Sequence, residues 1–207
     1  MAKSVSKKAA SQKTSKKKSS GKKAAGKKMA GKKALVVYES MFGNTEKVAH
    51  AIGEGLAHSL EVEVVEVSVA PVEPGPEVTL VVAGGPTHAF GMTREETRAD
   101  AIELGAAHGA REFGLREWID RLPTRHGGPS LATFDTRSLG RRRMPGSAAR
   151  AAARAARRHG YDEAVPAESF FVADTDGPLV PGELERASDW GRDLISLVKV
   201  TAKETRH

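Results

Sequence analysis

The stretch VVYESMFGNT, residues 36–45, starts as a buried strand and ends in the first residues of a helix. The apolar run 35–38 is typical of a strand that is covered on both faces. Gly43 and Asn44 have turn chemistry. Beyond them, apolar residues recur every fourth position, as on one face of a helix, at Val48, Ile52, Leu56 and Leu60. The stretch therefore predicts a strand, a tight turn and a helix in direct succession.

The rest of the chain repeats this alternation of short apolar runs and helical patterns. Further strands are expected at 62–67, 78–83, 131–134 and 169–173, and further helices at 112–122, 147–159 and 184–198. Residues 71–76 (PVEPGP) are too short and too rich in Pro for a helix, and residues 93–110 form a polar stretch. Five strands alternating with helices predict an α/β fold, a three-layer doubly wound sandwich with a five-stranded parallel sheet.

The charge of the chain is divided unevenly. Residues 1–33 hold 13 of the 33 Lys and Arg and none of the 26 Asp and Glu, so residues 34–207 hold 20 basic and 26 acidic side chains. A segment built from Lys, Ala, Ser and Gly has nothing large to bury. We therefore predict a disordered, lysine-rich basic tail at 1–33 and a single domain at 34–207.

Several classes of chemistry are excluded by composition. The chain has no Cys, which rules out disulfides, thiolate metal sites, iron–sulfur ligation and cysteine nucleophiles. Its seven His form no metal-binding array, and Asp174 and Asp176 alone are a weak pair, so no metal is expected. The apolar run 34–38 is too short for a signal peptide or a membrane helix, which predicts a cytoplasmic protein.

The loop after the first strand has the chemistry of an anion site. In doubly wound sheets, ligands bind beyond the carboxyl ends of the strands. Ser40 and Thr45 offer hydroxyls, Asn44 an amide, and Gly43 the backbone freedom to curl around a phosphate. The helix that follows adds free N–H groups at its positive end. The alternative is that Ser and Thr merely cap this helix.

At these residues the chain resembles the flavodoxin-like family. The family's phosphate-loop signature is two aliphatic residues, an aromatic, any residue, Ser or Thr, two more, a small residue, one more and Thr. Residues 36–45 satisfy every place, and the likeness extends over 34–200. The resemblance implies the strand order 2-1-3-4-5 and an FMN cofactor. Its phosphate would be held by Ser40, Met41, Phe42, Gly43, Asn44 and Thr45.

The loop after the third strand resembles the family's isoalloxazine-binding loop. Its cofactor-binding residues would be Pro86, Thr87, His88, Ala89, Phe90 and Gly91. The glycines of this loop allow close approach to a flat ligand. Either His88 or Phe90 would supply a stacking face, and His88 could also donate a hydrogen bond or a proton to the ring. The alternative is a plain Gly-Gly-Pro turn with Phe90 as a plug in the core.

The loop after the fourth strand departs from the family pattern. Classical flavodoxins place a Tyr or a similar aromatic against the ring here, whereas residues 135–160 contain no aromatic at all and carry arginines instead at 137, 141, 142 and 143. Positive charge beside a reduced, anionic flavin would favour reduction. Further arginines at 150, 154, 157 and 158 could extend this into a basic ridge for an acidic redox partner, a nucleotide phosphate or nucleic acid. The alternatives are a solvated basic loop and salt bridges to the acidic body.

The basic tail predicts a second interaction. Its polyanion-binding residues would be Lys16, Lys17, Lys18, Lys22, Lys23, Lys27, Lys28, Lys32 and Lys33. The composition resembles the tails of lysine-rich nucleoid proteins and predicts nonspecific binding of nucleic acid or polyphosphate. It offers no aromatic for base stacking and no apolar stripe for membrane insertion. Alternatively, the tail only keeps the protein soluble.

The sequence is compatible with two functions. The first is an FMN-binding redox protein that transfers electrons to or from a partner protein or a small-molecule substrate, as a carrier, a reductase or an oxidase. The second is a non-catalytic flavodoxin-like scaffold that binds nucleic acid or another polyanion through its tail. Fold alone does not choose between these chemistries, and no catalytic residue is assigned.

Overall fold

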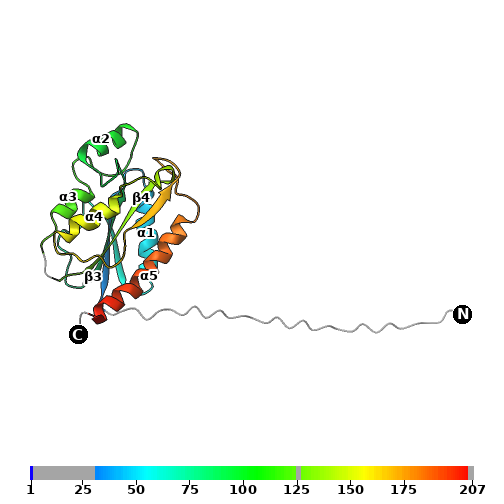
Figure 1. Ribbon diagram of the computed structural model, residues 1–207. Coiled ribbons are helices and arrows are strands. Elements are labelled where there is room, and N and C mark those ends of the chain that lie inside the picture. Colours follow the sequence, from blue (N-terminus) through cyan, green and yellow to red (C-terminus); the bar gives the residue numbers. More distant parts are fainter. Residues whose placement is uncertain (2–30, 125–126, 205–207) are drawn as a thin grey trace.

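The computed structural model describes residues 1, 31–124 and 127–204, with side chains described up to residue 196. Its centre is one parallel sheet with the strand order β2-β1-β3-β4-β5 (Figure 1). The strands are β1 (Lys33–Tyr38), β2 (Glu61–Glu66), β3 (Val78–Pro86), β4 (Ser130–Ser138) and β5 (Glu168–Val172). The expected fold class and strand order are confirmed. Of the tail predicted at 1–33, residues 2–30 lie outside the described residues.

Helices cover both faces of the sheet. On one face lie α1 (Asn44–Leu56) and α5 (Glu183–Glu204), and on the other α3 (Leu115–Asp120) and α4 (Ala148–Arg157). The helices α1 and α5 approach closely at Gly55 and Gly191, where a Cβ would overlap the backbone of the facing helix. The helix α2 (Glu95–Glu103) stands apart from both layers, at the top of Figure 1.

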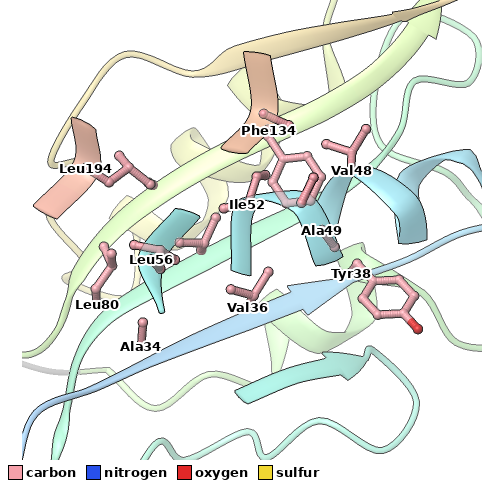
Figure 2. Close-up of a cluster of buried hydrophobic side chains, with 14 of the residues drawn as sticks. Ala34, Val36, Tyr38, Val48, Ala49, Ile52, Leu56, Leu80, Phe134 and Leu194 are labelled. Atoms are coloured by element: carbon pink, nitrogen blue, oxygen red, sulfur yellow. The ribbon is translucent and has the colours of Figure 1, made fainter. Parts of the chain in front are cut away.

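The strand β1 shows why its sequence is continuously apolar. Ala34, Val36 and Tyr38 belong to the core cluster under α1 and α5, whereas Leu35 and Val37 belong to the cluster under α3 and α4. Figure 2 shows the first of these clusters packed around α1. Because successive side chains of a strand point to opposite faces, a strand covered on both faces needs apolar residues at every position.

The structure corrects several expected boundaries. The polar stretch 93–110 contains α2, whose buried residues are only Arg98 and Ala101, so it lacks the apolar stripe that would predict a helix. The strand β4 runs four residues past the expected end, to Ser138. The helix expected at 112–122 begins only at Leu115. No helix joins β2 to β3, as predicted.

One glycine of β3 is fixed by packing. A Cβ at Gly84 would overlap the ring of Phe134, which is buried between Phe170 and Trp190. We expect Gly84→Ala to lower the free energy of unfolding by about 1–3 kcal/mol, as overpacked cores do. The control is Gly140→Ala, whose Cβ meets only ordinary contact, 3.7 Å from Ser138 Oγ. Guanidinium unfolding measures both, and equal stability of the two variants would contradict the packing argument.

Candidate functional site

A cavity of about 420 Å³ opens at the carboxyl ends of β1, β3 and β4. Its lining combines the two loops predicted from sequence with residues from β4, α2 and the segment after β5. The lining residues are Met41, Phe42, Asn44, Thr45, Pro86, Thr87, His88, Ala89, Phe90, Thr97, Asp100, Ala101, Leu104, Thr136, Arg137, Ser138, Arg141, Val172 and Thr175. Of the twelve predicted cofactor-binding residues, nine line it, and Ser40, Gly43 and Gly91 do not. The two loops therefore meet in one site.

The first loop presents unpaired donors at the start of α1. Gly43 occupies the N-cap position with φ 79° and ψ −8°, a left-handed conformation that favours glycine, and no side chain caps the helix. The capping alternative for Ser40 and Thr45 is therefore wrong. The first amides of a helix have no partner within the helix and are suited to an anion.

Ser40 is a second feature of this loop that suits an anion. Its side chain is only 2% exposed, and its Oγ has no hydrogen-bond partner among the described residues. A buried polar group without a partner costs about 1–3 kcal/mol. An oxyanion seated in the loop would accept this hydrogen bond.

Two hydrogen bonds fasten the first loop to β4 and to the segment after β5. Asn44 Nδ2 donates to the carbonyl oxygen of Asp176, at 2.8 Å, and the hydroxyls of Thr45 and Thr136 are 2.7 Å apart. A hydroxyl donates once and accepts twice, so each threonine keeps further hydrogen-bonding capacity toward the cavity. The sequence gives no signal for Thr136, because only the tertiary structure places its hydroxyl beside that of Thr45.

The second loop is a tight turn with a strained tip. His88 and Gly91 exchange two backbone hydrogen bonds, of 3.0 and 2.9 Å, while Ala89 and Phe90 have φ values of 43° and 69°. Two successive left-handed residues other than Gly are rare and cluster at functional sites. Close packing against Gly146, where a Cβ would overlap Phe90, holds the tip. Phe90 is 50% exposed, which contradicts the core-plug alternative.

His88 is poorly suited to donate a proton. Burial lowers the pKa of its imidazole, so the ring is neutral at pH 7. Its Nδ1 lies 3.3 Å from the carbonyl oxygen of Thr97. Only a protonated Nδ1 donates to a carbonyl, which leaves Nε2 as an acceptor. His88 therefore serves as part of the wall.

A buried carboxylate braces the second loop against α4. Asp135 Oδ2 accepts hydrogen bonds from Thr87 Oγ1 at 2.9 Å, Ser147 Oγ at 2.5 Å and the amide of Ala149 at 3.2 Å. Thr87 in turn accepts from the amide of Ala148, at 2.9 Å. Negative charge at a helix N-terminus is favourable. The network fixes the loop before any ligand arrives.

A second buried carboxylate stands directly before Ser40. Glu39 accepts hydrogen bonds from Thr93 Oγ1 at 2.6 Å and from the amide of Leu115 at 2.7 Å. The fully buried Arg98 donates to the same Thr93 hydroxyl, at 2.9 Å, and pairs with Glu117 at 3.1 Å. These bonds link the first loop to α2 and α3.

Glu39 gives the fold a pH dependence. Burial raises the pKa of this carboxyl above its ordinary value, against the opposing effects of its hydrogen bonds and Arg98. Its contribution to stability is therefore complete below the unfolded-state pKa and is lost as pH rises through the folded-state pKa. Relative to Glu39→Gln, the wild-type chain should lose stability as pH rises from 4 to 8. Guanidinium unfolding across this range tests it, and a relative gain would show that pairing with Arg98 dominates.

The third loop brings two of its four arginines to the cavity. Arg137 and Arg141 line it, whereas the exposed Arg142 and Arg143 do not. Arg137 Nη2 donates to the carbonyl oxygens of Arg141 and Met144, at 2.8 and 3.1 Å. Its Nε is buried without a partner in the described part of the chain. Positive charge thus borders the cavity where the family pattern has an aromatic.

The helix α2 forms a wall that sequence analysis missed. Thr97, Asp100, Ala101 and Leu104 come from α2 and its C-terminal end. The hydrogen bonds and the ion pair of the buried Arg98 hold this helix in place, and apolar packing contributes little. The sequence of the helix therefore has no hydrophobic periodicity by which it could be predicted. Leu104 is 72% exposed at the cavity.

The predicted polyanion-binding lysines can be placed only in part. Of the nine, only Lys32 and Lys33 fall within the described residues. Lys33 belongs to β1 and pairs with Glu61 at 3.2 Å, which raises the pKa of its ammonium group. Within the residues that the structure describes, His, Asp and Glu nowhere gather in a group of three or more suited to a metal ion. None of the helices in those same ranges is long and apolar enough to cross a membrane.

Fold and site together define a doubly wound α/β protein with an anion loop and an adjoining cavity at the carboxyl edge of its sheet. Residues 36–115 match the model of the flavodoxin family. The match covers less than half of the chain, and the sheet as a whole has the flavodoxin-like strand order β2-β1-β3-β4-β5. Among curated proteins, none matches this chain significantly.

Solved structures share this fold at low sequence identity. Oxidised flavodoxin 2 from Bacillus cereus is 19% identical, with a TM-score of 0.59, over 79% of this chain and 98% of that chain. A flavodoxin from Streptococcus pneumonia TIGR4 is 18% identical, with a TM-score of 0.55, over 79% and 98%. A flavodoxin from the domain Archaea is 20% identical, with a TM-score of 0.54, over 81% and 99%.

Proposed function

We propose that this domain binds FMN and transfers electrons to or from a partner protein or a small molecule. The observation that carries the proposal is the buried, unpartnered Ser40 hydroxyl in a loop whose helix lacks a side-chain cap. The cavity beside this loop, at about 420 Å³, falls within the usual range for small-molecule sites. The match to the flavodoxin family and the fold of the solved flavodoxins support the same ligand.

The chain's own residues would divide the work of binding. Ser40, Thr45 and the first amides of α1 would hold the phosphate, with helix dipole and hydrogen bonds in place of lysine or arginine. The Phe90 ring would cover one side of the flavin, held in place by the braced second loop. Bound FMN supplies one- or two-electron chemistry, while the protein supplies orientation and electrostatics.

Titration of the full chain with FMN tests this proposal. We expect quenching of flavin fluorescence with one FMN per chain and an increase in the thermal midpoint that grows with FMN concentration. A chain that neither quenches FMN nor gains thermal stability would leave the polyanion-binding scaffold as the better account.

Ser40→Ala should act oppositely on the free and the bound protein. Without FMN, removal of an unpartnered buried hydroxyl should leave stability unchanged or raise it by about 1 kcal/mol. With FMN, loss of a hydrogen bond to a charged group should weaken binding about 10- to 100-fold. Thermal melts and fluorescence titration measure the two effects. Unchanged FMN affinity would remove Ser40 from the phosphate site.

A further inference from the structure

The exposed side of α4 is a continuous arginine surface. Arg150, Arg154, Arg157 and Arg158 are all exposed and lie within about 100° of arc and about 12 Å of helix. The opposite side of α4 is buried alanine. No acidic residue occurs between Arg137 and His159. Among the described residues, Glu163 is the only carboxylate paired with these arginines, to Arg157 at 2.9 Å.

This surface continues to the mouth of the cavity. The N-cap residue of α4, Ser147, belongs to the network that braces the second loop, and the arginines 141–143 lie on the segment just before it. Arg141 itself lines the cavity. We call the arginines 141–143, 150, 154, 157 and 158 the arginine strip.

Exposed apolar side chains line the cavity, at Phe90 and Leu104, and flank the arginines 141–143 in the chain, at Leu139 and Met144. Phe90, Leu104, Leu139 and Met144 are 50, 72, 42 and 41% exposed. Apolar residues with Met and Arg are enriched at protein interfaces, where an apolar centre is surrounded by charge. A nucleic-acid surface has no need of this apolar centre, because phosphate contacts dominate its affinity. The combination favours a protein partner.

We propose that the arginine strip docks a redox protein with an acidic surface and orients its redox centre toward the mouth of the cavity. The proposal rests on the proposed FMN function. In the transfer, two reduced one-electron partner molecules each lose one electron, and the isoalloxazine ring gains both electrons with one proton from solvent. Complementary charge would speed encounter and fix orientation.

The test uses the full chain and an acidic plant-type [2Fe–2S] ferredoxin as the probe. The strip variant is Arg150→Gln with Arg154→Gln, both exposed and outside the cavity lining. The matched control is Lys47→Gln with Arg192→Gln, on α1 and α5 of the opposite layer. Both lose the same net charge and keep the tail. Anisotropy of labelled ferredoxin gives the dissociation constant without flavin, and anaerobic flavin bleaching gives the electron-transfer rate.

At about 20 mM salt, we expect the strip variant to weaken ferredoxin binding and slow electron transfer at least about tenfold, and the control at most about twofold. At about 0.5 M salt the difference should vanish. Equal effects of the two variants, or no binding by the wild type, would overturn the proposal. The proposal would also be overturned if the strip variant, and not the control, lost affinity for a 20-base-pair DNA while it still bound ferredoxin as the wild type does. If the chain did not bind FMN, the proposed function would be refuted. The anisotropy of labelled ferredoxin needs no flavin, so it would still show whether the arginine strip binds ferredoxin.

Discussion

The double variant Asn44→Asp with Thr45→Glu is expected to lose FMN binding, with an affinity at least about 10³-fold below that of the wild type. Both residues are buried at the start of α1 and line the cavity. Each substitution replaces a hydrogen-bond donor with a negative charge where the phosphate would lie. Repulsion between the new carboxylates and the phosphate, together with the lost hydrogen bonds, should reduce the binding free energy of FMN by more than about 4 kcal/mol at a partly buried site. Fluorescence titration measures the loss.

A neutral variant separates charge from packing in this experiment. Thr45→Val keeps the shape of the buried side chain and loses its hydroxyl and the contact with Thr136. It should weaken FMN binding only about tenfold. Circular dichroism and thermal melts establish that both variants are folded. A folded double variant that binds FMN as tightly as Thr45→Val would show that the phosphate lies elsewhere.

The positive charge at the cavity is expected to raise the redox potential of bound FMN. Arg137 and Arg141 line the cavity, and positive charge stabilises a reduced, anionic ring. We expect a two-electron midpoint at or above that of free FMN. Arg137→Gln with Arg141→Gln should lower it by about 40 mV, on the basis of about 1 kcal/mol per charge.

Spectroelectrochemical titration measures this midpoint. The control is Arg142→Gln with Arg143→Gln, which removes the same charge from exposed residues outside the cavity lining. Its shift should be less than half as large. A wild-type midpoint well below that of free FMN would contradict an electrostatic role for these arginines.

Much of the fold follows from local apolar patterns. The run 35–38 predicts a strand covered on both faces, and the structure divides its residues between two core clusters. The spacing of Val48, Ile52 and Leu56 likewise predicts α1, but Leu60, the next residue of this series, lies beyond the end of the helix. The Pro-rich segment 71–76 correctly excludes a crossover helix.

What the sequence did not reveal depends on polar contacts between distant residues. The helix α2 is held by the buried Arg98, whose partners come from three other segments. Glu39 is an unremarkable position within the loop signature until folding brings Thr93 and Leu115 to it. Such partners are set by tertiary structure and leave no periodic signal.

The candidate site, too, is predictable from the sequence only in part. The first two loops carry a recognisable pattern, and the structure brings them together. The roles of Thr136 and Gly146 appear only in three dimensions, through the Thr45 hydroxyl and the strained turn at Phe90. The absence of an aromatic in the third loop is visible in the sequence, but only the structure separates Arg137 and Arg141, which line the cavity, from the arginines that do not.

Calorimetric titration with FMN and with riboflavin, which lacks the phosphate, measures how much the first loop contributes to flavin binding through the phosphate. If the amides of α1 and Ser40 hold the phosphate, FMN should bind at one per chain and at least about 100-fold more tightly than riboflavin. Equal affinity for the two flavins, or no heat with either, would show that this loop does not bind the phosphate.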